Sequence, residues 1–258
     1  MKTKMRILLM LLLIGSFTLS AAEKEKGNGT LKSRSFTVEQ FETIEISSRI
    51  TLDEQSGLKM LSKKRRPKFD FYYTQTVEQS TVEVTIDENL LHWIVAEVKE
   101  GKLLITTKYD DLEVVPTQIT CRGASPLLKR VDINGYMNFT ANNLLHADSI
   151  AFYINGVSDV KLEDIRADYL RCHLSGVGNV YLKGKVGKGR WDISGVGKYF
   201  AYDCPVEELE CRLSGVGKMQ VNATERLIAE VSGVGSIRYT GAASIHASTS
   251  GIGRVKRK

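Results

Sequence analysis

Cysteine is scarce in this sequence, with four residues among 258. So few cysteines in a chain of this length exclude a disulfide-stabilised scaffold. No pair has the CxxC or zinc-ligand spacing that would indicate a redox or metal site. We expect buried thiols, with one disulfide bridge as the alternative, at Cys121, Cys172, Cys204 and Cys211.

Histidine is equally scarce, and its four copies lie at unrelated positions. A zinc site requires three ligands that converge on one point. No histidine is spaced to pair with a cysteine, serine or aspartate. The sequence therefore predicts neither a metal site nor a cofactor at His92, His146, His173 or His246.

Long apolar runs are absent except at the N-terminus. There, three basic residues precede an apolar run from Ile7 to Phe17, and the small residues Ser20, Ala21 and Ala22 follow it. Its apolar core of about 11 residues is too short for a transmembrane helix, which needs about 20. This order predicts a secretory signal peptide over residues 1–22 and no transmembrane segment. Its removal would lower the formal net charge from +6 to +3.

Glycine is plentiful, and a glycine-rich phrase close to SGVG recurs along the second half of the chain. Successive copies are 18 to 21 residues apart, a period near 19. Such a period is typical of repeat proteins in which each unit buries its apolar face only by stacking on its neighbours. The first glycines of the seven copies are Gly135, Gly156, Gly176, Gly195, Gly215, Gly233 and Gly251.

Alignment of the copies shows a two-residue alternation. The residues two and four positions before each glycine are largely apolar, and the residue between them is mostly polar. The apolar pattern resumes four residues after the glycine, at positions such as Val180 and Met219. Each copy is therefore predicted to be a short strand, a glycine turn and another short strand. We predict an all-β fold, a right-handed parallel β-helix-like solenoid with coils of about 19 residues.

The glycines have two interpretations. A phosphate-binding glycine loop follows a strand, opens a helix and usually occurs once, whereas no helical pattern follows these copies. A solenoid corner needs glycine for positive φ or for close backbone approach. We favour corners, and we expect the Asn or Ser before each glycine to hydrogen-bond along the stack.

The segment before the repeats carries further strand patterns. Alternating or β-branched residues occur over 36–47, 68–75, 81–87 and 101–109, with a hairpin turn at 99–102. We expect residues 35–258 to form a single solenoid domain, with an N-terminal β part (35–120) that starts or caps it and a repeat part (121–258). The polar residues 23–34 are expected to be a flexible spacer.

These segments together resemble the putative auto-transporter adhesin, head GIN domain family. The likeness rests on RSFTVEQFETI (34–44), VEVTIDENLL (82–91), VKEGKLLI (98–105) and the glycine corners, and it spans about 34–254. The resemblance implies an exported, β-helix-like protein of a Gram-negative bacterium, with an adhesive role and no established activity or catalytic residues. Tyr136-Met137 and Val157-Ser158 depart from the pattern by lacking the second glycine, which predicts a different turn there.

Residues suited to catalysis do not converge in this layout. A glycosidase-like site needs two carboxylates about 5 to 10 Å apart. Asp132 and Asp192 share an outward column but lie three coils apart, about 14 Å at one strand spacing per coil. A carbohydrate-active enzyme with its site in the N-terminal part nevertheless remains the alternative.

The strongest charged feature is the run KKRRPK. It could contact an anionic ligand, although a solvated loop tip between two strands is the simpler interpretation. The basic residues of the run are Lys63, Lys64, Arg65, Arg66 and Lys68.

The predicted function is an exported, non-enzymatic binding module, an adhesin or a component of the envelope surface. Its expected partners are a host or envelope glycan or a surface protein, and not nucleic acid. The periplasm, the outer surface and the medium all remain open as its location. A purely structural protein that forms homo-oligomers is a further alternative, because exposed ends of stacked sheets favour association.

Overall fold

The computed structural model describes residues 23–46, 50 and 69–258. The predicted signal peptide (1–22) and the basic run Lys63–Lys68 lie outside the described residues. Within them, the chain forms strands β1 to β18 and one 3-10 helix, η2 (Leu91–Trp93), and no α-helix. Among these residues, no helix is long and apolar enough to cross a membrane.

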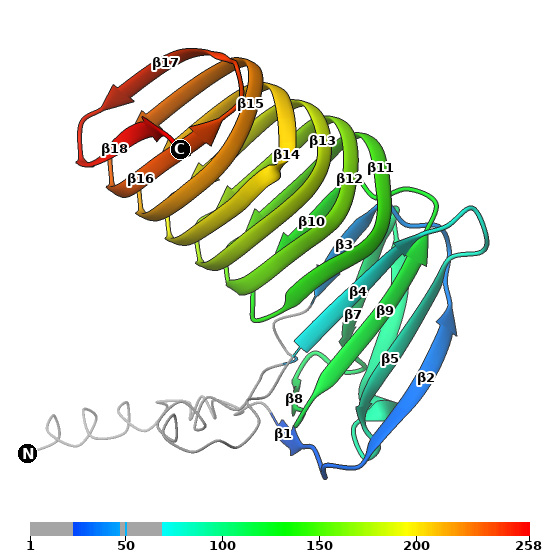
Figure 1. The fold of residues 1–258 in the computed structure, drawn as a ribbon. Coiled ribbons are helices and arrows are strands. Elements are labelled where there is room, and N and C mark those ends of the chain that lie inside the picture. The colour runs from blue at the N-terminus through cyan, green and yellow to red at the C-terminus, as the bar shows by residue number, and fades with distance from the viewer. Residues whose placement is uncertain (1–22, 47–49, 51–68) are drawn as a thin grey trace, which may run out of the picture.

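The second half of the chain is a β-solenoid of about six turns with coils of roughly 20 residues, which confirms the predicted architecture. Neighbouring strands pair in parallel, coil upon coil (Figure 1). The strands of this part are β10 (Arg130–Ile133), β11 (Asn138–Ile154), β12 (Val157–Leu174), β13 (Val177–Ile193), β14 (Val196–Leu213), β15 (Val216–Val231), β16 (Val234–Thr240), β17 (Ser244–Thr249) and β18 (Ile252–Arg257).

Each complete coil is one long, bent strand of 16 to 18 residues rather than the two short strands expected from the sequence. The bend coincides with a register shift, for example between Leu162 and Ile165 in β12. Bulges of this kind bend a strand without ending its pairing. A coil therefore has one tight glycine corner and one bulged bend.

The N-terminal part extends both sides of the first coil. One side continues through β3 (Thr43–Ile46), β7 (Lys102–Thr107) and β6 (Ile94–Lys99). The other continues through β4 (Phe69–Gln75), β9 (Ile119–Ser125), β5 (Thr81–Asp87) and β2 (Leu31–Thr37). Some pairs here are antiparallel, such as β6 with β7 across the predicted 99–102 hairpin, where Glu100 and Gly101 have positive φ.

The polar segment 23–34, expected to be a flexible spacer, contains two elements in the structure. β1 (Glu23–Lys26) pairs with β8 (Leu112–Val115), and β2 pairs antiparallel with β5. The first five residues of β2 are exposed, so the segment lacks the apolar alternation by which strands are recognised. Its strands result from pairing with a partner far away in the sequence.

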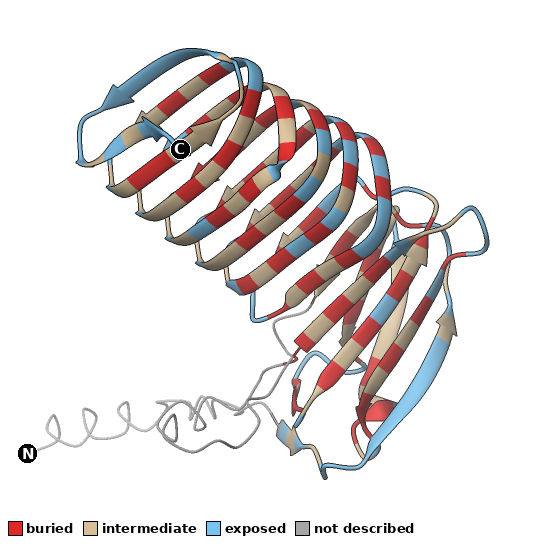
Figure 2. Cartoon of the chain, in the orientation of Figure 1, coloured by how far each residue is buried: buried red, intermediate tan, exposed pale blue. Residues whose placement is uncertain are grey.

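The core lies between the two sides of the solenoid, and burial alternates along the coils from β11 to β15 (Figure 2). The predicted inward columns are buried as far as the sixth copy, whereas Ala247 and Thr249 of the last coil are exposed. Aromatic rings stack along these columns, with 5.8 Å between the ring centroids of Phe71 and Phe139. The core is thus continuous from the N-terminal part into the repeats.

Close backbone approach, not positive φ, explains the corner glycines. None of the seven has a positive φ. A Cβ placed on Gly176 would overlap the carbonyl oxygen of Gly156 in the coil before, and the same holds from corner to corner up to Gly251. Glycine is needed because successive corners stack in direct contact.

The predicted Asn and Ser stack is present at the first corners. The Asn155 side chain donates to Oδ1 of Asn134 at 2.9 Å, and the Ser175 hydroxyl donates to Oδ1 of Asn155 at 2.8 Å. The corner at Gly156 was expected to have a different turn, but its backbone hydrogen bonds match those of the later corners. For example, the Val157 N–H donates to the carbonyl oxygen of Gly135 at 2.9 Å. The buried Ser158 is accommodated without a change of turn.

Asp87 joins three segments of the N-terminal part. Its fully buried carboxylate accepts hydrogen bonds from the Gly29 N–H at 2.6 Å and from the Thr117 N–H and hydroxyl at 2.8 Å each.

We expect Asp87→Ala to lower the free energy of unfolding by about 2 kcal/mol, because it leaves buried donors without an acceptor. Urea denaturation measures the loss. The exposed neighbour is the control, since Glu88→Ala removes only a surface ion pair and should change stability by less than about 0.5 kcal/mol.

Candidate functional site

The side of the solenoid that follows the corner presents three outward columns. Because side chains alternate along a strand, the residues one, three and five positions after each corner glycine face the same way. In β14 these are Val196, Lys198 and Phe200, and in β15 they are Val216, Lys218 and Gln220. The parallel register places equivalent residues beside each other on adjacent strands. The result is a regular, outward-facing array.

Five basic residues gather on this array in the last coils, and we call them the basic face. Lys198 and Lys218 are direct neighbours on β14 and β15. Arg238 on β16 lies beside Lys256 on β18. The members of the basic face are Lys198, Lys218, Arg238, Arg254 and Lys256. Three of them are exposed and the other two are half-buried.

The basic face has no counter-charge in the described part of the chain. None of its five side chains forms an ion pair there, although sixteen residue pairs elsewhere do. The positive charges of Arg238, Arg254 and Lys218 lower the pKa of Lys256. Like charges placed directly opposite on neighbouring strands are destabilising. The fold therefore carries a repulsive cluster that its own stability does not require.

Aromatic rings border the basic face. The rings of Tyr181 and Phe200 stack with their centroids 4.8 Å apart. Both belong to the same column as Gln220, and Phe200 is the neighbour of Gln220 in the coil before. Both rings are half-buried. The Nζ atom of Lys161 lies 5.7 Å from the centroid of the Tyr181 ring, and Nζ of Lys258 lies 4.6 Å from the centroid of the Tyr202 ring. The side that follows the corner thus combines positive charge with partly accessible rings.

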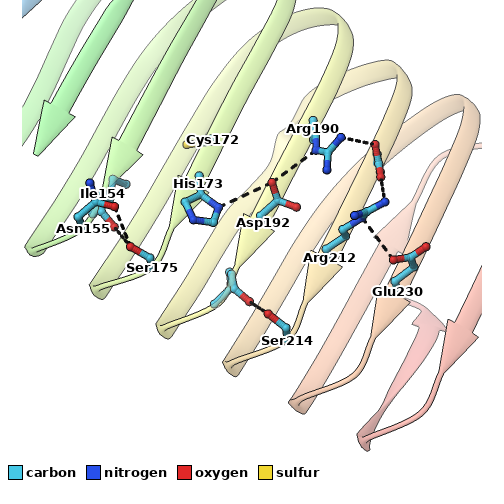
Figure 3. A network of polar contacts seen from close by, with 12 residues as sticks. Ile154, Asn155, Cys172, His173, Ser175, Arg190, Asp192, Arg212, Ser214 and Glu230 are labelled. Atoms are coloured by element: carbon cyan, nitrogen blue, oxygen red, sulfur yellow. Dashed lines mark hydrogen bonds and ion pairs between the residues drawn. The ribbon is translucent and has the colours of Figure 1, made fainter.

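The side that precedes the corner is charged but compensated. There arginines alternate with acidic residues across successive coils, with His173 beside Asp192 at one end, and we call this line the charge ladder (Figure 3). Arg212 contacts Glu210 at 2.6 Å and Glu230 at 3.3 Å. With each charge facing its opposite, the ladder offers little net attraction to a ligand. Its members are His173, Arg190, Asp192, Glu210, Arg212 and Glu230.

An open polar hollow lies on the same side as the charge ladder, near the N-terminal part. Its charged residues are paired, Lys102 with Glu45 at 2.9 Å and Arg130 with Asp132 at 2.7 Å. The register of β3 and β10 places Glu45 directly beside Asp132, and each carboxylate has a basic side chain as its partner. Because both carboxylates are engaged in ion pairs, the charges of the hollow are compensated like those of the charge ladder.

The four cysteines are free thiols, and all are buried. The predicted buried thiols are confirmed, and the alternative of one bridge is wrong. Burial raises the pKa of the Cys172 and Cys204 thiols to about 12. A thiol needs its thiolate form to act as a nucleophile or a metal ligand. Over the described part of the chain, no three His, Cys, Asp or Glu side chains cluster so that they could hold a metal ion.

The basic face was not predicted from the sequence, although two signals pointed to it. Lys198 and Lys218 occupy the same position in consecutive copies, and the chain ends in VKRK. Only the register of β16 and β18 shows that these two clusters adjoin. The predicted anionic contact at Lys63–Lys68 lies outside the described residues and stays a prediction.

The sequence profile named "Putative auto-transporter adhesin, head GIN domain" matches residues 64–243 of the chain. No curated protein matches the chain by sequence.

Solved structures share the fold. A putative adhesin from Bacteroides fragilis is similar with a TM-score of 0.78 and 25% sequence identity, over 91% of this chain and 100% of that one. A putative adhesin from Parabacteroides distasonis has a TM-score of 0.69 and 27% identity, over 92% and 100%. A putative lipid binding protein from Parabacteroides distasonis has a TM-score of 0.69 and 23% identity, over 92% and 100%.

Proposed function

We propose that this chain, which belongs to the "Putative auto-transporter adhesin, head GIN domain" family, is an exported, non-enzymatic module that attaches to an anionic surface through its basic face. The observation that carries the proposal is the cluster of five basic side chains without counter-ions on a rigid sheet. A surface that bears phosphate or carboxylate groups would supply the missing charges. The adhesin-like family and solved structures support a binding role.

The rest of the chain is consistent with this role. The leader-like residues 1–22 support export. The solenoid supplies a long core that holds the outward columns in register, so a ligand finds the charges already positioned. Preorganisation of this kind reduces the entropy that is lost on binding.

The basic face can be tested by retention on heparin-agarose, an immobilised anionic polymer. We expect the wild-type protein to bind at low salt and to elute as the salt concentration rises, because exposed charges are screened. The double variant Lys198→Gln/Lys218→Gln should bind about 30-fold more weakly, at roughly 1 kcal/mol for each cation lost near an anionic surface.

A matched control separates the basic face from net charge. Lys183→Gln/Lys185→Gln removes the same two charges, but these lysines are exposed and already paired with Glu163 at 2.6 Å and Glu207 at 3.2 Å. The control variant should be retained almost as well as the wild-type protein. An equal loss in both variants would show that attachment depends on overall charge, and the proposal would be wrong.

A further inference from the structure

A second unexplained feature lies at the corners of the coils. The residue after each corner glycine is apolar and solvent-exposed, and the five valines among these residues retain 46% to 50% of their accessible surface. Each residue is the parallel neighbour of the next along the solenoid. We call the set the corner-valine column: Tyr136, Val157, Val177, Val196, Val216, Val234 and Ile252.

The column is a long, straight apolar ridge. Seven residues at a strand spacing of about 4.8 Å extend over roughly 29 Å. Inward-facing residues already fill the core, so the fold gains little from apolar side chains at these outward positions. Contiguous exposed apolar surface on a soluble protein marks an interaction site.

The ridge and the basic face belong to the same surface. Val216 and Lys218 lie two residues apart on β15, so their side chains point to the same side, about 7 Å apart along the strand. The same pairing occurs on β14 with Val196 and Lys198. In the last coils the apolar column therefore runs directly beside positively charged side chains. A partner for this surface must offer an apolar region that the valines can enter, next to negatively charged groups.

We propose that this surface docks on a lipid bilayer with anionic headgroups. The corner-valine column enters the headgroup layer, while the basic face lies against the lipid phosphates. Proteins that bind a membrane surface in this way combine buried apolar area with electrostatic attraction to anionic lipids. The inference rests on the proposed function above and names the kind of surface that the module attaches to.

Charge complementarity favours a bilayer over the other occupants. A second copy aligned in parallel along the ridge would set one basic face against the other, which like-charge repulsion opposes. In an antiparallel pair each basic face would lie against the first coils of the partner, and the oligomeric state measured below distinguishes that case. A soluble anionic polymer would satisfy the lysines and arginines but would leave the valines in water. A bilayer with anionic headgroups satisfies both columns at once.

Vesicle co-sedimentation of the mature protein tests the docking. The vesicles contain either phosphatidylcholine alone or an equimolar mixture of phosphatidylcholine and phosphatidylglycerol. We expect binding to the mixed vesicles and little binding to the neutral ones. The triple variant Val177→Thr/Val196→Thr/Val216→Thr keeps the β-branched shape but adds hydroxyl groups, and it should bind the mixed vesicles at least about tenfold more weakly.

Two controls make the result specific. The triple variant should retain the melting temperature and the heparin-agarose retention of the wild-type protein, because the substitutions leave the fold and the charges intact. The Lys198→Gln/Lys218→Gln variant should bind both the mixed vesicles and heparin more weakly than the wild-type protein. A triple variant that binds mixed vesicles like the wild-type protein would overturn the inference.

The failures of the two proposals are distinguishable. A wild-type protein retained on heparin but not bound to vesicles would overturn only the bilayer inference. Absence of both interactions would overturn the proposed function as well. If sedimentation equilibrium shows a dimer that the triple variant cannot form, the ridge belongs to a second copy, and the bilayer inference is wrong.

Discussion

Replacement of Gly215 by alanine should lower the free energy of unfolding by about 3 kcal/mol, at the upper end of the usual cost of overpacking. Its new Cβ would overlap the carbonyl oxygen of Gly195, and this oxygen accepts the Val216 N–H at 2.9 Å. The corner could relieve the overlap only by moving away from its neighbour, which would break the backbone hydrogen bonds that join the two coils. Urea denaturation followed by far-ultraviolet circular dichroism measures the change.

Gly135 provides the matched control for this substitution. It occupies the same position in the first copy, but nothing lies within 4 Å of a Cβ placed there. Gly135→Ala should therefore be neutral or stabilise the fold by up to about 1 kcal/mol, because alanine restricts the unfolded chain. Equal destabilisation at both corners would mean that glycine is required by the shape of the turn and not by the contact between coils.

The second large effect is expected at Trp191, which is fully buried and lies between Cys172 and Cys211 in its column. These two small neighbours leave room for the indole, which stacks on Tyr199 at 6.1 Å between ring centroids. Trp191→Ala should cost about 4 kcal/mol of stability, because the cysteines cannot fill the cavity that it leaves. The measurement is again urea denaturation.

Phenylalanine at the same position tests the reason for that loss. The indole N–H of Trp191 has no hydrogen-bond partner among the described residues, so Trp191→Phe removes no bond and keeps most of the apolar volume. We expect it to cost clearly less than the alanine variant, under about 2 kcal/mol. If the two substitutions lower the free energy of unfolding equally, then Trp191 does not stabilise the protein by filling the interior of the coil.

The repeat part was predictable because its signals are local and are repeated. Columns such as Ile154, Leu174 and Ile193 reveal their inward direction by comparison with each other, and all three are buried. The continuous strands were missed because the bulged bend has no glycine or proline of fixed position to mark it. The sequence alone does not decide between positive φ and close backbone approach at the corner glycines, because a contact between coils depends on the register of the strands.

The N-terminal part and the candidate site were harder for a common reason. β2 is polar and gains its structure from β5, some 50 residues later in the chain. The basic face likewise joins Lys218 to Arg254 through the register of three strands. The lack of counter-ions around these side chains is a property of the folded surface. Along the sequence, the run at Lys63–Lys68 is therefore more conspicuous than these scattered lysines and arginines.

The bulged bends bear on how such a molecule can change in evolution. Between neighbouring coils from β11 to β15, the first register shift begins about five or six residues beyond the corner, as at Ala141, Leu162 and Ala201. Insertions and deletions are absorbed there, so the columns that start at the corner keep their alignment although the copies differ in length. A gene duplication of one whole coil would lengthen the platform by a single increment of about 4.8 Å and leave the rest unaltered. Avidity for an extended surface could thus be tuned by the number of coils alone.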